Sequence, residues 1–208
     1  MTRVSIAATP KGERRRQALV AAAADLILEG GIDAVRHRAV AHRAGLPLAS
    51  TTYYFHSLDD LVASAVQHNG RRELDVMRSR VQCVPPSDRG PESTADLIVD
   101  LLVGPGGVGE IERERLIARY ERCVATARHP ELRDVQKELR AQIEQLLTDL
   151  LQRCGRSVHE PQLRRLVAVV DGAVLGALGD LDPDPRALAR CILPGVLEGV
   201  APPAEQEA

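Results

Sequence analysis

Apolar residues recur every three or four positions along most of the chain, and this spacing restricts the fold more than any other feature. Between residues 13 and 29, the apolar positions that share one helical face are Leu19, Ala22, Ala23, Leu26 and Ile27. The strict alternation of apolar and polar residues that is typical of half-buried strands is absent. With only three tyrosines, one phenylalanine and no tryptophan, aliphatic side chains must build the core. The sequence therefore predicts an all-α fold.

Glycine and proline divide this pattern into about nine helices. We expect helices near residues 13–29, 37–44, 48–55, 58–81, 94–103, 110–129, 131–153, 160–179 and 186–198. Ser93 or Thr94 is the expected cap of the fifth helix, and Pro130 the first residue of the seventh. Residues 1–12 are expected to form a mobile arm, and the tail after residue 201 to be disordered by its composition. A boundary at Ser57 separates a small domain, 1–57, from a larger helical domain, 58–208.

Residues 37–56 have the pattern of a helix-turn-helix, in which a tight turn joins two short helices. The turn requires a residue that tolerates positive φ, and Gly45 meets this requirement. Four residues earlier the two helices approach closely, which requires a small side chain such as Ala41. The residues expected to anchor both helices to the first helix are Val40, Ala44, Leu46, Thr51 and Phe55. The residues left on the outer face are Leu48, Ala49, Thr52, Tyr53 and His56.

Positive charge and aromatic residues gather in the same small domain. Residues 1–57 contain eight Lys and Arg against four Asp and Glu, whereas the remainder contains 19 against 25. A basic domain joined to an acidic body is typical of a protein that binds nucleic acid by one end. Three of the four aromatic residues lie together at 53–55, and a small domain seldom buries three consecutive aromatics. Tyr53 is therefore predicted to contact DNA phosphate rather than to complete a local core.

The segment 31–61, GIDAVRHRAVAHRAGLPLASTTYYFHSLDDL, resembles the N-terminal domain of TetR-family transcriptional regulators. The resemblance covers about residues 13–61, and its PLASTTYYF segment is similar to a form common in actinobacterial members. The rest of the chain resembles the family only in length and helix order. Three positions depart from the usual pattern: Pro47 replaces a serine that caps the helix, Thr52 replaces a tyrosine, and Leu58 replaces a lysine. The missing contacts predict affinity and salt dependence at the weaker end for the family.

The resemblance assigns a DNA-binding role to each position of the motif. Arg38 would reach a guanine edge, since its planar fork suits O6 and N7. The residues implied to contact phosphate are Arg36, His37, Thr52, Tyr53 and Tyr54. The residues implied to lie at base edges are Leu48, Ala49 and Ser50, with the two apolar side chains on thymine methyl groups. Arg14, Arg15 and Arg16 either add phosphate contacts or form a solvated charge run.

The resemblance also implies a homodimer, formed by the last two long helices of each chain. The small residues along one side of the helix 160–179 are Gly172, Ala173, Gly176, Ala177 and Gly179. Small residues let two helices approach closely, so they indicate a dimer interface, with close packing inside the chain as the alternative. A dimer also suits double-stranded DNA, because two recognition helices read a palindromic operator in successive major grooves.

The larger domain is further implied to bind an unknown small-molecule effector. The polar residues expected at its pocket are Arg119, Tyr120, Cys123 and Asp171. A structural ion pair with an arginine is the alternative for Asp171. In the family's mechanism, the effector tilts the helix that begins at Leu58 and releases the repressor from DNA. A repressor without an effector, an activator of the same fold and a helical protein-interaction module remain alternatives.

Other classes of protein find no support in the sequence. An enzyme is not expected, because the HExxH, GxSxG and glycine-rich phosphate motifs are absent. No cofactor or metal is expected either. The four cysteines lack metal-ligand spacing and are predicted to be small buried residues in a reducing cytoplasm: Cys83, Cys123, Cys154 and Cys191. The most apolar stretch, 166–181, contains two aspartates and is too short and too charged for a membrane span. We therefore expect a bacterial cytoplasmic protein that associates with the nucleoid when bound to DNA.

Overall fold

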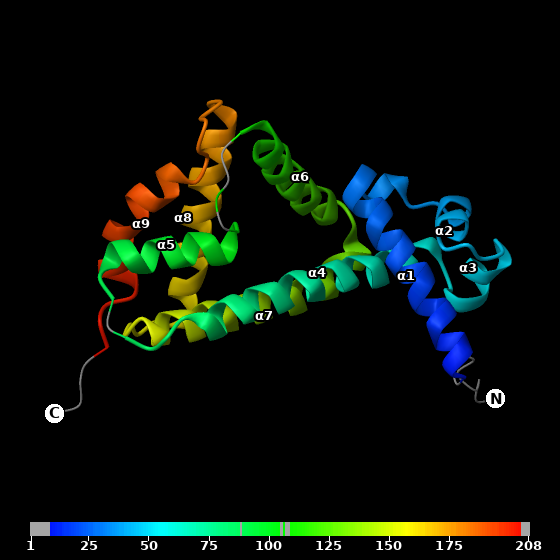
Figure 1. Ribbon diagram of the computed structural model, residues 1–208, viewed down its shortest axis with the longest axis horizontal. Coiled ribbons are helices and arrows are strands. Elements are labelled where there is room, and N and C mark those ends of the chain that lie inside the picture. Colours follow the sequence, from blue (N-terminus) through cyan, green and yellow to red (C-terminus); the bar gives the residue numbers. More distant parts are fainter. Residues whose placement is uncertain (1–8, 88, 105, 107–108, 205–208) are drawn as a thin grey trace. The chain divides into compact units, whose positions relative to one another are not determined.

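A computed structural model describes residues 9–87, 89–104, 106 and 109–204, and within them the chain is all-α (Figure 1). The α-helices are α1 (Pro10–Gly30), α2 (His37–Arg43), α3 (Ala49–Tyr54), α4 (Leu58–Cys83), α5 (Pro91–Leu102), α6 (Glu110–Ala127), α7 (Arg133–Arg153), α8 (Glu160–Gly179) and α9 (Ala187–Val200). Two short 3-10 turns, Ile32–Ala34 and Pro130–Leu132, complete the order. The predicted all-α fold with about nine helices is confirmed for the described residues.

Two predicted helix starts are wrong. Helix α5 begins at Pro91 after the N-cap Gly90, because proline lacks the N–H that would be left unpaired at a helix start. Thr94 is buried inside the helix and donates its hydroxyl to the Gly90 carbonyl at 2.9 Å. Pro130 opens a 3-10 turn rather than the long helix, since the Leu132 N–H donates three residues back, to the His129 carbonyl, at 3.0 Å.

At both ends, the structure describes ordered residues where disorder is predicted. Thr9 caps α1 by accepting a hydrogen bond from the Gly12 N–H at 3.1 Å, so the arm does not extend to residue 12, and residues 1–8 lie outside the described part. After α9, the Pro202 carbonyl accepts from the Ser157 N–H at 3.0 Å, and the Ala204 N–H donates to the Gly155 carbonyl at 2.8 Å. These bonds hold the chain up to residue 204, and residues 205–208 lie outside the described part.

The prediction of four buried cysteines is wrong for three of them. Cys154 is buried, whereas Cys83, Cys123 and Cys191 are exposed because they lie on the outer faces of their helices. No three or more His, Cys, Asp or Glu side chains of the described chain are grouped as a metal ion would require. None of the helices in this part of the chain has the length and apolar character needed to cross a membrane.

The described chain packs as two compact units. The first combines the described part of Met1–Glu73 with Glu121–Leu139, and the second combines Leu74–Tyr120 with the described part of Arg140–Ala208. The first unit thus contains the predicted domain 1–57 together with the beginning of α4 and the connection between α6 and α7. The limits 1–57 and 58–208 follow the sequence motif and remain a proposal.

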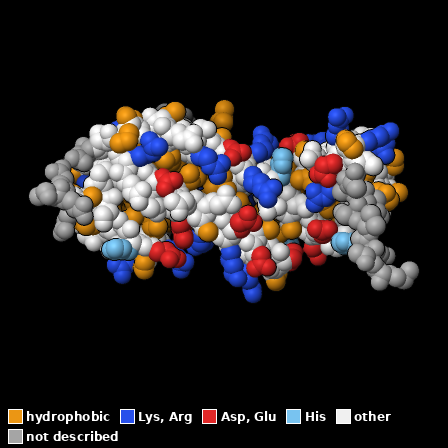
Figure 2. Space-filling view, turned by 90° about the horizontal axis from the view of Figure 1, so that it is seen from below, with side chains coloured by type: hydrophobic (Ala, Val, Ile, Leu, Met, Phe, Trp, Pro, Cys, Tyr) orange, Lys and Arg blue, Asp and Glu red, His pale blue; other side chains and the backbone are white. Residues whose placement is uncertain are grey.

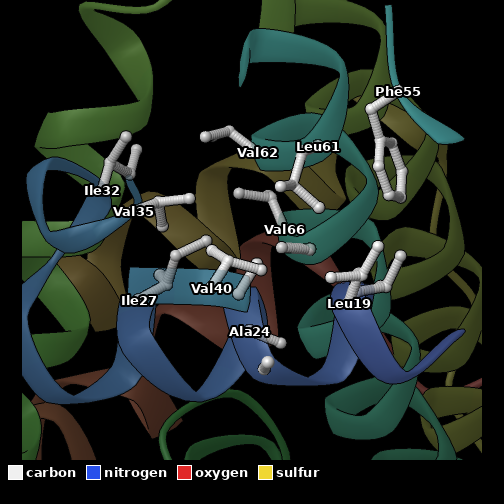
Figure 3. Close-up of a cluster of buried hydrophobic side chains, with 14 of the residues drawn as sticks. Leu19, Ala24, Ile27, Ile32, Val35, Val40, Phe55, Leu61, Val62 and Val66 are labelled. Carbon is white, nitrogen blue, oxygen red and sulfur yellow. The ribbon is translucent and has the colours of Figure 1, made fainter. Parts of the chain in front are cut away.

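The first unit is built around the apolar face of α1 (Figure 3). The buried residues drawn around it include Leu19, Ala24, Ile27, Ile32, Val35, Val40, Phe55, Leu61, Val62 and Val66. Leu132, from the 3-10 turn before α7, is fully buried in the same cluster. Each fully buried Leu, Val or Phe contributes about 1.5–3 kcal/mol relative to an exposed position. The cluster therefore fixes α2, α3 and the start of α4 against α1.

Polar and close contacts add to this packing along α4. The Asn69 side chain donates to the Ala24 carbonyl of α1 at 3.0 Å. A Cβ atom at Gly70 would come within 2.5 Å of the methyl groups of Leu139, so glycine permits the close approach of α4 and α7. These contacts hold the first half of α4 between α1 and the beginning of α7.

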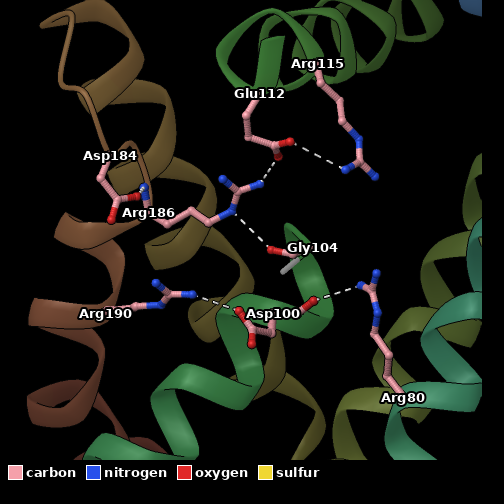
Figure 4. Close-up of polar contacts among 8 residues, drawn as sticks. All are labelled: Arg80, Asp100, Gly104, Glu112, Arg115, Asp184, Arg186 and Arg190. Atoms are coloured by element: carbon pink, nitrogen blue, oxygen red, sulfur yellow. Dashed lines mark hydrogen bonds and ion pairs between the residues drawn. The ribbon is translucent and has the colours of Figure 1, made fainter. Parts of the chain in front are cut away.

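The second unit packs α5, α8 and α9 together, and a buried arginine lies at the start of α9 (Figure 4). Arg186 is fully buried; its Nε donates to the Gly104 carbonyl at 3.1 Å and its Nη2 to the Glu112 carboxylate. Nearby, Arg190 donates to Asp100 at 2.8 Å. Because a buried charge needs partners, these contacts hold the beginnings of α6 and α9 at the end of α5.

Truncation of Leu132 tests its place in the first unit. We expect Leu132→Ala to lower the free energy of unfolding by about 2–5 kcal/mol, because it leaves a cavity in a core whose preceding buried member, Val66, lies 66 residues earlier in the sequence. Ile111→Ala, at an exposed position of α6, is the control and should change it by less than about 0.5 kcal/mol. Urea unfolding at a fixed protein concentration measures both, and equal small effects would contradict the assignment.

Candidate DNA-binding site

Helices α2 and α3 form a helix-turn-helix beside α1 (Figure 1). Gly45 has φ +64°, as the sequence predicts for the turn. Its N–H donates to the His42 carbonyl at 3.1 Å, and the Leu46 N–H donates to the Ala41 carbonyl at 3.0 Å. Ala41 is buried where the two helices approach each other. The predicted roles of Gly45 and Ala41 are confirmed.

The predicted anchors of this motif face the core of the first unit. Val40, Thr51 and Phe55 are buried, while Ala44 and Leu46 are half-buried against the same cluster. Thr51 can be buried because its hydroxyl donates to the Leu48 carbonyl at 2.8 Å. No side chain caps the start of α3, as expected from proline at position 47. One face of α3 therefore packs against the core of the first unit.

The opposite face of α3 presents apolar and aromatic groups to solvent. Leu48 is 50% exposed and Tyr53 is 59% exposed, and Ala49 and Thr52 are also exposed. Ser50 is half-buried. An exposed leucine at the N-cap and an exposed tyrosine on this six-residue helix indicate a contact surface, because neither side chain is buried in the core.

The two tyrosines of α3 have different environments. Tyr54 is half-buried and packs against the core of the first unit, whereas Tyr53 points outward. Their rings meet edge to face, with centroids 4.9 Å apart. Tyr54 therefore supports the position of the Tyr53 ring, and Tyr53 presents its hydroxyl to the surroundings.

Basic residues lie at the starts of α1 and α2. Arg36 and Arg38 are exposed, and His37 is half-buried, with its Nδ1 atom buried and without a hydrogen-bond partner. Arg14 and Arg15 are also exposed on α1. Figure 2 shows basic and acidic side chains interleaved on the face that it presents. The arginines without acidic partners are therefore the ones that indicate a surface for phosphate.

Two other arginines of the first unit are engaged in packing. The Arg16 guanidinium lies 5.1 Å from the centre of the Phe55 ring, a cation–π contact across the core edge. Arg43 donates to both carboxylate oxygens of Glu29, at 2.8 and 2.6 Å, and this hydrogen bonding lowers the pKa of Glu29. Neither contact has a local sequence signal, because the partners are 39 and 14 residues apart.

Helix α4 begins at the capping contacts that the sequence indicates. The Ser57 hydroxyl accepts from the Asp60 N–H at 3.0 Å, and the Asp60 carboxylate accepts from the His56 N–H at 3.2 Å. Leu58 is half-buried against the cluster of the first unit. The position that carries lysine in the usual family pattern therefore contributes to packing here.

The four predicted effector contacts do not gather around a described cavity. Tyr120 donates its hydroxyl to Asp171 at 3.1 Å, which joins α6 to α8. The expected ion pair of Asp171 with an arginine is not found among the described residues. Arg119 is half-buried, and its Nε is buried without a hydrogen-bond partner. Cys123 is exposed in the first unit.

Two cavities of the second unit are described, and neither is lined by these four residues. The larger, about 620 Å³, lies between α4 and α7; its polar lining includes Arg78, Gln145, Asp149 and Arg153. The smaller, about 270 Å³, lies beside the start of α5.

The small residues of α8 occupy two different faces. Gly172, Gly176 and Gly179 are exposed, and a Cβ atom at any of them would meet nothing within 4 Å apart from the backbone of its own helix. Ala173 and Ala177 are buried inside the chain. The exposed apolar residues of the same helix and of α9 are Leu175, Leu188 and Ile192. The alanines thus pack internally, while the glycines stay open.

Comparison with known proteins adds independent information about the helices that follow the helix-turn-helix. A family model described as the tetracyclin repressor-like C-terminal domain matches residues 89–199. The HTH-type transcriptional regulator PksA of Bacillus subtilis is 27% identical over 176 residues, which is 82% of this chain and 81% of that protein.

Solved structures resemble most of the chain. The multidrug binding protein EbrR, in complex with imidazole, is 30% identical with a TM-score of 0.65, covering 88% of this chain and 94% of its own. A transcriptional regulator of Streptomyces coelicolor is 27% identical with a TM-score of 0.67, covering 88% and 98%.

An N-terminal helix-turn-helix followed by an all-α body defines a DNA-binding transcriptional regulator. The chain belongs to the TetR family. The family match lies in the region where the sequence alone indicates only length and helix order.

Proposed function

We propose that the protein is a repressor that binds a palindromic operator as a homodimer and leaves it when a small-molecule effector binds. The outer face of α3 carries this proposal, since Leu48 and Tyr53 are exposed there without serving the core. The bacterial chromosome is the proposed place of action. An activator or an effector-independent repressor would share this surface and differ in its response to ligands.

Each residue predicted to contact DNA is exposed or half-buried in the first unit. Arg38 is proposed to read a guanine edge, and Leu48 and Ala49 to pack on thymine methyl groups. The proposed phosphate contacts are Arg36, His37, Thr52, Tyr53 and Tyr54, with Ser50 beside the base edges and Arg14 and Arg15 as additions from α1. Tyr54 and His37 are half-buried, so their contribution is expected to be smaller than that of Tyr53.

A salt titration of binding to the gene's own promoter region, followed by fluorescence anisotropy, tests these roles. Arg38→Ala should lose about 1–3 kcal/mol of discrimination at one base pair per half-site, because the guanine contact is lost. Tyr53→Phe should weaken binding to all sequences alike, because it removes only a phosphate donor. Arg140→Ala, an exposed arginine of α7, is the control. Specific binding that neither motif variant alters would refute this interface.

The proposed dimer interface is the exposed face of α8 and α9. It comprises Gly172, Gly176 and Gly179, joined by the exposed apolar side chains of Leu175, Leu188 and Ile192. Ala173 and Ala177 are left out of this face because the chain itself buries them. An open glycine row beside exposed aliphatic side chains suits close contact with a second helix pair.

Gly176→Arg tests the dimer interface. Its side chain finds open space within one chain, so the monomer should fold with unchanged circular dichroism, while the dimer dissociation constant should rise at least about tenfold because a charge is buried at the interface. Sedimentation velocity measures the dissociation constant. Ala141→Arg, at an exposed position of α7, is the matched control. A Gly176→Arg protein that remains as dimeric as the control would rule out this face.

The effector is proposed to be an organic cation held near Asp171. This carboxylate is half-buried, and its described partner is the neutral Tyr120 hydroxyl, so its negative charge is not neutralised by an ion pair. EbrR has been solved in complex with proflavin and with ethidium, both aromatic cations. Together these observations favour a cationic aromatic ligand at the contact between α6 and α8.

Dye fluorescence tests this effector site. Proflavin and ethidium should bind and lower operator affinity, and Asp171→Asn should weaken dye binding by about tenfold or more, because the charge pair is lost. Asp180→Asn, at the exposed end of α8, is the control. Equal dye affinity in both variants would exclude Asp171 as the residue that binds the dye. If the protein instead binds an aromatic carboxylate more tightly than the dyes, Arg119 would be the contact to test.

A further inference from the structure

The larger cavity of the second unit lies between the last turns of α4 and of α7. Its volume is about 620 Å³, a size typical of sites for small molecules. Val81 and Leu146 are the buried aliphatic residues of its lining, and Pro86 adds to it from the turn between α4 and α5. Every residue that lines the cavity belongs to the second unit. The cavity is therefore a feature of one compact body.

Hydrogen bonds fix the wall of the cavity at the end of α7. Nη1 of Arg153 donates to the Val84 carbonyl at 2.9 Å. In return, the Ser87 N–H donates to the Arg153 carbonyl, also at 2.9 Å. The turn after α4 and the last turn of α7 thus hold each other. The guanidinium of Arg153 is consequently in place before any ligand binds, which lowers the cost of binding.

Two opposite charges of the lining remain without a charged partner. Asp149 and Arg153 are both half-buried and lie one turn apart on α7, a spacing at which an acid and a base often pair. Here the Asp149 carboxylate accepts instead from the neutral Gln145 amide at 2.9 Å, and Arg153 donates to a backbone carbonyl. Neither has an ion-pair partner among the described residues.

The third charge of the lining does not neutralise them. Arg78 is exposed, and its Nη1 lies 2.7 Å from the carboxylate of Asp75, one turn earlier on α4. The cavity therefore offers one free anion, Asp149, and one free cation, Arg153, on the same helix face. Half-buried charges are stabilised by partners of opposite sign, so these two favour a ligand that carries both signs close together.

The remaining polar lining consists of primary amides. The four glutamines of the cavity are Gln82, Gln142, Gln145 and Gln152. A primary amide presents both N–H donors and a carbonyl acceptor, so it pairs most completely with another amide. The rest of the ligand is therefore expected to be polar and uncharged, with methylene groups that can cover Val81 and Leu146.

We propose that this cavity binds a free α-amino acid whose side chain ends in an amide. Such a zwitterion carries its ammonium and its carboxylate on one carbon, so the ammonium donates to Asp149 while the carboxylate accepts from Arg153. The side-chain amide pairs with the glutamines of the wall. None of the lining residues belongs to the proposed effector contact at Asp171 or to the DNA-binding motif, so this site adds a second ligand to the proposed function.

Isothermal titration calorimetry of the full chain with L-glutamine tests the proposal. L-glutamine should bind saturably, at a single site per chain. Two analogues separate the two charges: N-acetyl-L-glutamine lacks the ammonium, and L-glutaminamide lacks the carboxylate. Each analogue should bind at least about tenfold more weakly than L-glutamine, because one charged contact is lost.

Two variants assign the contacts to their residues. Asp149→Asn keeps an acceptor for Gln145 and should bind L-glutamine no better than N-acetyl-L-glutamine. Arg153→Gln keeps a donor for the Val84 carbonyl and should bind L-glutamine no better than L-glutaminamide. A loss of structure would weaken all three compounds alike, so this crossed pattern reports on direct contacts. Asp134→Asn, at an exposed position of α7 outside the cavity, is the matched control and should keep the preferences of the wild type.

Three results would overturn the proposal. The first is the absence of saturable L-glutamine binding, which would leave water and salt ions as the occupants of the cavity. The second is equal weakening of all three compounds in Asp149→Asn and Arg153→Gln. The third is displacement of L-glutamine by proflavin, which would make this cavity the site of an organic cation. Operator binding, measured on the same samples by anisotropy, reports separately on the proposed function.

Discussion

Burial of the aliphatic face of α1 is the interaction on which the DNA-binding unit depends. Leu19, Ile27 and their neighbours form the surface against which α2, α3 and the start of α4 pack. Phe55 is the single phenylalanine of the chain, and it packs among the aliphatic side chains of this cluster. The positive φ of Gly45 directs the chain from α2 into α3, but the buried Thr51 and Phe55 decide which face of α3 remains exposed.

A different interaction organises the second unit. Arg186 is fully buried, and its contacts with Gly104 and Glu112 hold the starts of α6 and α9 at the end of α5. Helix α6 then continues into the first unit, where Ala125 packs against the DNA-binding core and Leu132 is buried in it. Helix α4 likewise belongs to both units. Helices α4 and α6 therefore each contribute residues to both units.

The sequence predicts the motif of the first unit well because its determinants are local. The turn glycine, Ala41 and the anchors lie within 15 residues, and helical geometry relates them directly. Helix ends are less well predicted: Pro91 and Pro130 both occupy first positions, yet one opens an α-helix and the other a 3-10 turn. The sequence does not predict the exposure of Cys83, Cys123 and Cys191 either. Cysteine is small and apolar, so it is accommodated both on the buried face of a helix and on its exposed face.

By itself, the sequence determined the all-α fold, the order of the helices and the turn of the DNA-binding motif, because these follow from spacing along the chain. All four of the small residues at positions 172, 173, 176 and 177 suit a close helix contact. Tertiary structure alone decided that Ala173 and Ala177 pack inward while Gly172 and Gly176 stay open. It also decided that Asp171 meets Tyr120 rather than an arginine. Partners 40 or more residues apart leave no periodic signal, and only packing brings them together.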